Sequence, residues 1–527
     1  MSDAIPLPLQ LIWLVPLYGF SGMLLSLPWA TGWIKRNGPR PAAYLNLLVT
    51  LLAVLHGSLA ISEVVALGPQ HLDFPWFEAA DLNLRIGFDL SLTNLAALEL
   101  ITTMSLVCQV FALGYLDKEW SLARFYALVG FFEGAMSGVV LSSNLFMSYF
   151  LLEMLTLSTY LLVGFWYAQP LVVTAARDAF LTKRVGDVLL LMGVVALSAM
   201  AGSMEFNDLY AWAGAARDQQ LISPLVGTLL GIALIAGPMG KCAQIPLHLW
   251  LDEAMESPLP STVLRNSVVV IGGAWVLLRL EPLIALSPLV QGVLVVVGGS
   301  TAVVASLIAL AQVDVKRALS FLVSSWLGLL FVAVGLGGTA VADHLLLVYP
   351  LPMALLLLAI GTIVISNVTQ DLTQLGGLWS KRPLIGIAFL VGAGGLMGLP
   401  PFASFAALRE LLALTASSGH PVLLGGVVLI TNALISAGLI RVFGQIWGGR
   451  PTPFTTRSPE VLWLMVLPTL VLMGLVLHIP QLLVHIGVYQ LTPLPGWGPW
   501  GVPLLLSTLL GAGSSAFFYL RPHPLAE

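Results

Sequence analysis

Long apolar stretches separated by short polar connections run along the whole chain of 527 residues. A helix needs about 20 apolar residues to cross a bilayer, and lipid leaves backbone polar groups no partner outside the helix itself. The pattern therefore predicts an all-α, polytopic membrane protein with about fifteen transmembrane helices. The predicted spans are residues 9–31, 42–66, 91–114, 123–141, 145–168, 178–203, 224–245, 260–280, 287–312, 318–338, 343–368, 383–413, 422–447, 460–486 and 500–520.

Composition supports the membrane class, since 58% of the residues are hydrophobic and only 9% are charged, against about 25% charged residues in soluble proteins. The net charge of −4 is small, and no basic-aromatic patch indicates nucleic-acid binding. Cys108 and Cys242 lie in or beside apolar stretches, and two cysteines are too few to hold an iron–sulfur cluster. No basic residue precedes the first apolar stretch near Leu9, so that stretch does not resemble a cleaved signal peptide.

Lysine and arginine are distributed unevenly when alternate loops are assigned to opposite sides of the membrane. The positive-inside rule places the richer side in the cytoplasm, so we predict an N-terminus on the outer side and a cytoplasmic C-terminus. The other side receives only Arg85 and Arg217. The richer side receives Lys35, Arg36, Arg40, Lys118, Arg124, Arg177, Lys183, Arg184, Lys316, Arg317, Lys381, Arg382, Arg450, Arg457 and Arg521.

The remaining basic residues fall within or against the predicted spans: Lys241, Arg265, Arg279, Arg409 and Arg441. Each such residue costs about 2.5–3.5 kcal/mol or more in lipid, which favours a functional interpretation. Arg279 and Arg441 lie near span ends, where a side chain reaches the headgroups easily, and a structural role is favoured there. Lys241 and Arg409 lie beside proline-bearing segments, and a functional role is favoured.

Acidic residues also occur inside apolar segments. Glu153 has no oppositely charged neighbour at helical spacing, so its partner must come from another helix. Asp187 is open to two interpretations, a functional carboxylate or a plain intrahelical pair with Lys183 one turn away. Glu133 and Glu99 are weaker candidates of the same kind.

Two segments carry prolines close to these charges, at residues 235–246 and 397–412. Proline removes a helix hydrogen bond and frees carbonyls, and paired broken helices in the two halves of a transporter indicate an inverted repeat with mid-membrane ion paths. Two unrelated kinks are the alternative.

Carboxylate–lysine pairs change each other's charge state when they open and close, so a chain of them can relay protons. The candidate members are Glu153, Asp187 and Lys241 in the first half and Lys316, Arg409 and Glu410 in the second.

His248 stands near Asp252, Glu253 and Glu256, which raises the question of a metal site. One histidine with scattered acids is more typical of a hydrogen-bonded titrating group, so no metal is predicted in this chain. His248 could instead relay protons between Lys241 and the cytoplasm or a second channel. His56, inside an apolar span, is interpreted as a hydrogen-bonded core histidine.

The segment "KCAQIPLHLWLDEAMESPLPSTVL" resembles the signature of the NuoL/NdhF branch of antiporter-like subunits of respiratory and photosynthetic complex I. Further motifs of that family follow in the same order as here. They are "LLEMLTLSTYLLVGFW" around Glu153, "KRVGD" at Asp187, "DVKR" at Lys316 and "GLPPF" before Arg409. The matches extend from about residue 120 to residue 450.

This resemblance implies two inverted five-helix repeats, each with a half-channel at a broken helix. It implies N-terminal helices over residues 1–120, repeats over 121–285 and 286–450, and C-terminal helices over 451–527. The implied function is that of a non-redox, proton-translocating membrane subunit of an NAD(P)H/ferredoxin–plastoquinone oxidoreductase. Glu153 and Lys241 would then be a coupled pair, with Asp187 supporting proton uptake and Lys316 relaying onward. Plastoquinone and iron–sulfur clusters would belong to other subunits, and a second antiporter-like subunit would be a neighbour.

The departures from the family pattern concentrate in the second half. Asn266 replaces an expected histidine beside Arg265, Tyr349 replaces another histidine, and Met353 replaces a lysine. The terminal lysine–aspartate pair is shifted into Arg409 and Glu410. Because arginine hardly deprotonates, we assign Arg265, Asn266 and Tyr349 a gating or steering role. The last span and lateral helix of respiratory members are missing or lie beyond this sequence.

These departures resemble the NdhF-type subunits of cyanobacterial complexes dedicated to CO2 uptake. That resemblance implies a thylakoid membrane and a peripheral cytoplasmic protein that hydrates CO2, with any zinc mainly on that partner. Lys35 and Arg36 on a cytoplasmic loop are the candidate contacts. Two alternatives stay open: a stand-alone inorganic-carbon or cation/proton transporter subunit of the same fold, and a structural subunit that no longer pumps.

Overall fold

The computed structural model describes residues 5–35, 38–79, 82–488 and 497–520. Arg36 and Arg521, which entered the predicted orientation, lie outside these ranges. The chain forms two compact units, the first built from Met1–Lys241, Glu256–Leu264 and Trp275–Ser287. The second unit comprises Cys242–Met255, Arg265–Ala274 and Pro288–Glu527.

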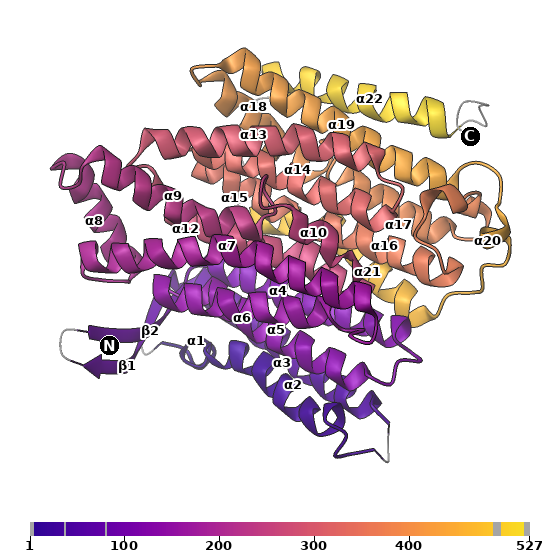
Figure 1. Cartoon of the computed structure of the whole chain (residues 1–527), viewed down its shortest axis with the longest axis horizontal. Helices are drawn as coiled ribbons and strands as arrows, with labels where there is room; N and C mark the ends of the chain where they lie inside the picture. The colour runs from indigo at the N-terminus through magenta and orange to yellow at the C-terminus, as the bar shows by residue number, and fades with distance from the viewer. Residues whose placement is uncertain (1–4, 36–37, 80–81, 489–496, 521–527) are drawn as a thin grey trace. The chain divides into compact units, whose positions relative to one another are not determined.

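The first unit is a helical assembly with one β-hairpin (Figure 1). Apolar composition over about 20 residues accounts for most of its helices, and Asn144 caps one of them by accepting from the backbone of Phe146 at 2.8 Å. Its elements are α1 (Leu7–Gln10), α2 (Leu14–Ala30), α3 (Arg40–Leu67), β1 (Gln70–Ala79), β2 (Leu82–Leu90), α4 (Leu92–Tyr115), α5 (Leu122–Leu141), α6 (Leu145–Val163), α7 (Pro170–Ala201), α8 (Phe206–Asp218), α9 (Pro224–Lys241) and α11 (Leu259–Leu264).

A bent helix belongs partly to each unit. It consists of α11, a π-helical turn over Arg265–Val269 and α12 (Val270–Ile284). The second unit begins with α10 (Leu249–Glu253) and a 3₁₀ turn over Ala254–Glu256. Its further helices are α13 (Pro288–Ala311), α14 (Val315–Gly335), α15 (Thr339–Val348), α16 (Pro350–Asn367), α17 (Pro383–Gly394), α18 (Ala403–Ala416), α19 (Pro421–Trp447), α20 (Pro453–Thr456), α21 (Trp463–His485) and α22 (Gly498–Tyr519), with 3₁₀ turns over Leu372–Gln374 and Leu378–Ser380.

Each predicted span coincides with apolar helix in the structure. Thirteen helices among the described residues are long and apolar enough to cross a membrane. The other two predicted spans correspond to shorter apolar helices, Leu14–Ala30 and Pro383–Gly394. The predicted span 383–413 is broken between α17 and α18, because consecutive prolines at 400 and 401 offer no backbone N–H to continue a helix. The predicted span 343–368 is divided at Tyr349, directly before Pro350, into α15 and α16.

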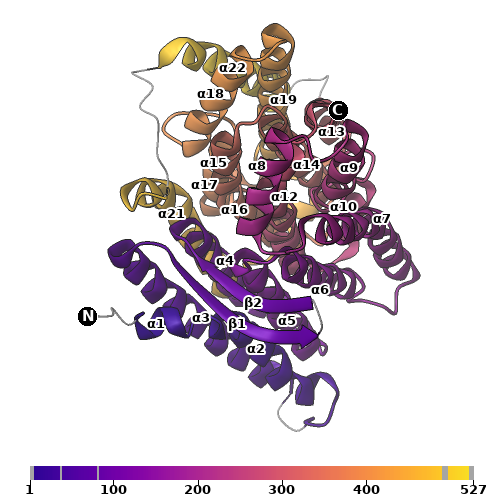
Figure 2. The ribbon, with the colours of Figure 1, turned by 90° about the vertical axis from the view of Figure 1, so that its left-hand side faces the viewer.

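The hairpin of β1 and β2 was not among the predicted elements. The strands pair antiparallel, with Leu72 opposite Phe88 and Phe74 opposite Ile86, and Figure 2 shows them beside the helices of the first unit. Position 87 of β2 has no room for a side chain, because a Cβ there would lie 2.0 Å from the hydroxyl of Ser143 in the connection after α5. The search for spans of about 20 residues missed this segment, since its apolar positions alternate at the two-residue period of a strand.

In the second unit α19 and α22 pack closely through glycine. A Cβ on Gly511 would lie only 1.9 Å from the backbone oxygen of Ala433. Small residues let membrane helices approach until their backbones touch. Two residues further along the same helix, Gly513 faces open space.

We expect Gly511→Ala to lower the stability of the membrane-embedded subunit by about 1–3 kcal/mol, because the backbones must separate. Gly513→Ala is the matched control and should be neutral or stabilise by up to about 1 kcal/mol, since alanine favours helix. Thermal unfolding of the purified complex in detergent measures both. Equal melting temperatures for the two variants would contradict the close packing.

Candidate functional site

Lys241 is the last residue of α9, and its side chain is buried. Its ammonium nitrogen lies 2.6 Å from a carboxylate oxygen of Asp187 on α7, and both side chains are 2% exposed. It also donates a hydrogen bond to the hydroxyl of Thr156 on α6. Thr156 in turn lies 3.4 Å from the second oxygen of Asp187. Three helices of the first unit thus meet at one ion pair, which offsets the cost of burying each charge alone.

Glycines bring α7 and α9 close enough for this contact. A Cβ on Gly186 would lie 2.5 Å from the backbone oxygen of Ala236, and a Cβ on Gly237 would lie 2.5 Å from the side chain of Leu190 on α7. Figure 1 shows the two helices running beside each other. Gly186 directly precedes Asp187, so the point of closest backbone approach is adjacent to the ion pair.

The predicted break near Lys241 is present. Pro238 lies inside the last turn of α9, and the helix ends at Lys241. Ala243 then has a φ of 51°, a left-handed conformation that residues other than glycine rarely adopt. The lysine therefore sits where regular helix stops and backbone groups lose their helical partners.

Glu153 finds its partner on another helix, as predicted. The partner is Arg184 on α7, which forms an ion pair with one carboxylate oxygen. The other oxygen of Glu153 is buried and has no hydrogen-bond partner among the described residues. The resemblance implied a Glu153–Lys241 pair, whereas the direct contacts of Lys241 are with Asp187 and Thr156. Because Glu153 and Thr156 are three residues apart on one helix face, Glu153 lies one turn from the ion pair.

Asp187 forms its ion pair with Lys241 on another helix. The alternative of a plain intrahelical pair with Lys183 did not include this contact. Lys183, one turn before Asp187, is also buried at 2% exposure. The first unit therefore gathers two carboxylates, two lysines, one arginine and one threonine hydroxyl over neighbouring turns of α6, α7 and α9. Such a row of close, alternating charges is the arrangement that a proton relay requires.

The second unit brings together the residues assigned to gating or steering. Arg265 and Asn266 open the π-helical turn between α11 and α12, and π-turns occur frequently at functional sites. The Arg265 guanidinium donates to the carbonyl of Ala254 and, at 3.2 Å, to the amide oxygen of Asn266. Tyr349, fully buried, donates its hydroxyl to the backbone carbonyl of Asn266.

Lys316 joins this cluster from α14. Its ammonium donates to the carbonyl of Met255 at 3.2 Å, and the Asn266 amide donates to Ser320 on the same helix at 2.8 Å. Asp314 caps α14 by accepting from the backbone of Lys316 at 2.8 Å. Arg265, Asn266, Tyr349 and Lys316 therefore form one polar cluster within the second unit. Arginine hardly deprotonates, and a fixed positive charge raises the barrier to protons and cations.

Arg409 and Glu410 lie on α18, and both are buried. Glu410 pairs with His344 on α15, with 2.5 Å between a carboxylate oxygen and the ring nitrogen Nδ1. The Arg409 guanidinium lies 6.0 Å from the ring centre of Phe405. Glu410 and His344 therefore form a second buried pair of ionisable side chains, within the second unit.

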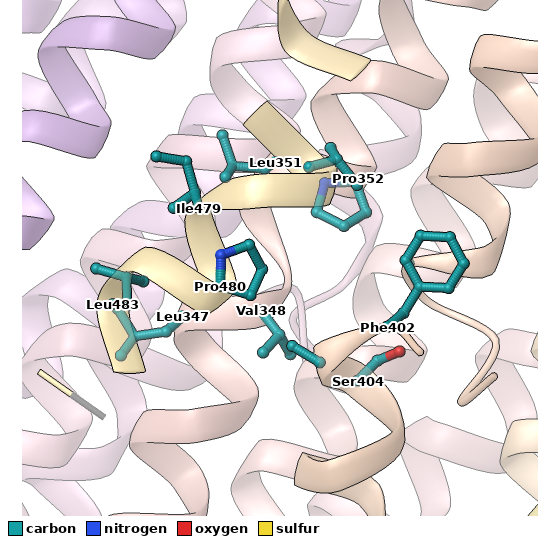
Figure 3. Close-up of a pocket in the computed structure, with 12 residues that line it drawn as sticks. Leu347, Val348, Leu351, Pro352, Phe402, Ser404, Ile479, Pro480 and Leu483 are labelled. Carbon is teal, nitrogen blue, oxygen red and sulfur yellow. The ribbon is translucent and has the colours of Figure 1, made fainter. Parts of the chain in front are cut away.

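An apolar pocket lies where broken helices of the second unit meet (Figure 3). Figure 3 shows Pro352 and Phe402 from the two broken regions beside Pro480 of α21. The hydroxyl of Ser404 is buried there with no hydrogen-bond partner among the described residues. Because its lining is otherwise almost entirely apolar, this pocket offers no continuous route for protons.

Two arginines in the spans have the contacts of structural residues. Arg279 donates to the carbonyl of Ser142 at 2.5 Å, just after α5 ends. Arg441 donates to the carbonyls of Ala309 and Gln312 at the end of α13. Both satisfy carbonyls that a helix leaves without partners at its C-terminus, in agreement with the structural role favoured for them.

The remaining candidates are placed as follows. His248 directly precedes α10 in the second unit, with its ring 6.4 Å from Phe321, and its relay role stays a prediction. His56 bonds to the carbonyl of Pro8 at 2.8 Å, as a core histidine does. Lys35 is exposed, while Arg36 lies outside the described residues. Within the described ranges no group of three or more His, Cys, Asp or Glu side chains could hold a metal ion.

Sequence reasoning missed three participants. Thr156 and His344 were visible as polar residues inside apolar helices, which is itself a signal. Arg184 was counted among the charges of the cytoplasmic side, because the sequence does not show how far a helix extends beyond the membrane. The structure places Arg184 inside α7 with its side chain 37% exposed.

The comparisons with known proteins agree with this architecture. Residues 142–436 match the family described as "NADH:quinone oxidoreductase/Mrp antiporter, TM". Residues 76–126 match "NADH-Ubiquinone oxidoreductase (complex I), chain 5 N-terminus". The chain therefore belongs to the NADH:quinone oxidoreductase/Mrp antiporter family. Within it, the chain is an NdhF-type, antiporter-like membrane subunit of complex I.

Two kinds of relative support this assignment. A protein of Paulinella chromatophora, "NAD(P)H-quinone oxidoreductase subunit 5, organellar chromatophore 2", is 54% identical over 97% of this chain and 82% of its own length. The chloroplastic subunit 5 of Lotus japonicus is 33% identical over 74% of this chain, but the match covers only 53% of that longer protein. A second Paulinella protein, named as chromatophore 1, is 31% identical over 82% of this chain.

Solved structures share the fold. A chain from the "Structure of Mrp complex from Dietzia sp. DQ12-45-1b" matches with a TM-score of 0.82 at 19% identity, covering 98% of this chain and 56% of that one. A chain of the archaeal membrane-bound sulfane sulfur reductase matches with a TM-score of 0.77 at 19% identity, covering 95% and 99%.

We expect Thr156→Val to slow proton translocation about tenfold while the complex still assembles. Valine keeps the shape but removes the hydroxyl that Lys241 and Asp187 share, and a hydrogen bond to a charged group is worth about 1.5–3 kcal/mol. Thr159→Val is the matched control, because its hydroxyl bonds only the carbonyl of Leu155. Proton uptake by proteoliposomes containing the complex is the measurement. The same loss in both variants would argue against a specific role for Thr156.

Proposed function

We propose that this chain is the distal antiporter-like, proton-translocating subunit of a photosynthetic complex I that couples ferredoxin–quinone electron transfer to proton pumping and CO2 hydration. The observation that carries the proposal is the buried contact of Lys241 with Asp187 and Thr156 at the broken end of α9. Redox cofactors have no part in this chain's own role. Its part is to hold and pass protons.

In this proposal the proton moves by the opening and closing of ion pairs. While Lys241 contacts Asp187, each group favours the charged form of the other. When the pair opens, the buried lysine loses its counter-charge and releases a proton, since a lone charge in a low-dielectric site is costly. Glu153 with Arg184 stands one helical turn away and sets the charge around Asp187, so a change at one pair alters the other.

The second half of the chain acts more as a barrier and outlet than as a copy of the first. Arg265 places a fixed positive charge at the π-turn, and Asn266 and Tyr349 surround it with neutral hydrogen-bonding groups. Lys316 is the titratable member of this cluster. Glu410 with His344 supplies the last exchange site, and Arg409 next to them steers charge without giving up its own proton.

The CO2-uptake version is supported by the pattern of relatives. Two subunit 5 proteins of the single organism Paulinella chromatophora differ strongly in their similarity to this chain, at 54% and 31% identity. The chain thus resembles one specialised version of the subunit. The replacements at Asn266, Tyr349 and Met353 favour the same interpretation, because they remove titratable groups from the second half.

The proposal includes a location and partners. The chain would lie in a thylakoid membrane with a lumenal N-terminus and a cytoplasmic C-terminus, beside a second antiporter-like subunit. A peripheral protein that hydrates CO2, carrying any zinc, would contact the cytoplasmic loop at Lys35, which is exposed, and at Arg36. Plastoquinone and the iron–sulfur clusters would be bound by other subunits. A stand-alone inorganic-carbon or cation/proton transporter is the competing possibility, and isolation of the chain without quinone-reductase subunits would favour it.

We expect Lys241→Arg to abolish proton translocation while preserving assembly. Arginine keeps the positive charge opposite Asp187 but hardly releases its proton, so the variant separates an ion pair needed for folding from a relay. Lys241→Ala and Glu153→Gln should also reduce proton uptake at least tenfold, measured in membranes energised by quinone reduction. Full pumping by the Lys241→Arg variant would rule out Lys241 as a relay.

We expect the double change Lys35→Glu and Arg36→Glu to release the peripheral CO2-hydrating protein from the purified complex, because opposite charges on the loop would repel its acidic contact surface. The quinone-reductase subunits should stay bound. Quantitative mass spectrometry of the affinity-purified complex provides the measurement. Arg40→Glu is a matched control, since Arg40 pairs with Asp117 of this chain. Unchanged recovery of the peripheral protein in the double variant would remove this loop from the contact.

A further inference from the structure

A second buried carboxylate lies in the first unit, away from the Lys241 ion pair. Glu133 on α5 has no exposed surface. One of its oxygens, Oε2, accepts from the hydroxyl of Thr50 on α3 at 2.7 Å and from the hydroxyl of Ser105 on α4 at 2.5 Å. The amide of Gln109, also on α4, lies 3.3 Å from the same oxygen. Three helices, α3, α4 and α5, therefore converge on one acid (Figure 1).

The donors around Glu133 are all on one side. Its other oxygen, Oε1, is buried and has no hydrogen-bond partner among the described residues. One turn further on α5, the hydroxyl of Ser137 is also buried without such a partner. No lysine or arginine forms an ion pair with Glu133 within the described ranges. A buried carboxylate without a counter-charge is costly unless a cation or a proton neutralises it.

The arrangement favours a proton over a metal ion. Hard metal ions bind through several oxygens whose lone pairs face the metal. Here two hydroxyls and an amide turn their hydrogens toward Oε2 instead, so Oε1 is the one carboxylate oxygen of Glu133 left to bind. A proton on Oε1 removes the charge without needing any further oxygen ligand, and the unpartnered hydroxyl of Ser137 lies one turn further along the same helix face.

A polar stripe along α4 leads to this acid. Glu99, Thr102, Ser105 and Gln109 recur at the three- and four-residue spacing of one helix face. Glu99 is half-buried and accepts from the hydroxyl of Ser58 at 2.8 Å. Its second oxygen lies against Gly57, where a Cβ would approach to 2.3 Å. Six residues of helix separate Glu99 from Ser105, a rise of about 9 Å.

We infer that Glu133, with Thr50, Ser105 and Gln109, forms a separate proton-binding site in the bundle of α3, α4 and α5, and that Glu99 is its access residue. The site shares no residue with the Lys241 ion pair or with the Glu410–His344 pair. Its capacity to hold a proton does not depend on the proposed function. The chain then has a proton-binding site in addition to the Lys241 ion pair and the Glu410–His344 pair.

Infrared spectroscopy of the purified complex tests the proton on Glu133. The wild type should show the carbonyl band of a protonated carboxylic acid, shifted on transfer to heavy water, and Glu133→Gln should lack that band. Glutamine has the same shape and keeps an acceptor for Thr50 and Ser105, so assembly should be retained. Identical spectra for wild type and variant would overturn the inference.

Labelling with dicyclohexylcarbodiimide provides an independent readout that needs only the wild-type complex. This apolar reagent adds to protonated carboxylic acids within membranes, so peptide mass spectrometry should find the adduct on Glu133.

The role of Glu99 as access residue is tested by exchange. Glu99→Gln should slow hydrogen–deuterium exchange of the Glu133 infrared band several-fold, whereas Glu63→Gln, which changes an acid on α3 outside the stripe, should leave the rate unchanged. Strong suppression of labelling by sodium at constant pH would indicate a metal-ion site instead and would also overturn the inference. Equal exchange rates in the Glu99→Gln and wild-type complexes would overturn the assignment of Glu99 as the access residue.

Discussion

A charged side chain inside a membrane is costly unless another group compensates for it. In the first unit Lys241 and Asp187 compensate each other's charge through their buried ion pair. The pair needs α7 and α9 in backbone contact, which glycines at 186 and 237 allow. The lysine is also the residue at which α9 ends, within one turn of Pro238. Local sequence, helix packing and proton chemistry therefore depend on the same few residues.

The two units use their buried charges differently. In the first, Lys241 is held by the carboxylate of Asp187. In the second, the contacts described for Arg265 are with a backbone carbonyl and a neutral amide, and arginine keeps its proton. The first arrangement is suited to exchange and the second to a barrier. Under the proposed function, this asymmetry would let one fold move protons in one part of its length and restrain them in another.

Much of the fold follows from sequence alone, because lipid forces every long apolar stretch into a helix. The spans and the break beside Lys241 were predicted for this reason, and so was an interhelical partner for Glu153. The identity of that partner was not, since Arg184 meets Glu153 only after α6 and α7 pack. The β-hairpin was missed because its alternation is short, and His344 was missed because its partner Glu410 lies 66 residues away. Sequence identifies which groups must be paired, and packing decides with which.

The π-turn at Arg265–Val269 has a consequence for evolution of the second half. Such a turn holds one residue more than an α-helical turn, so deleting a single residue there would convert it into an ordinary α-helical turn and leave the helix beyond it in its present phase. The side chains of the turn itself would shift by one place, so that a neighbouring residue would stand where Asn266 now does. One codon gained or lost could therefore exchange the residue at this position without any substitution, and comparisons between relatives should align this helix by its geometry as well as by its letters.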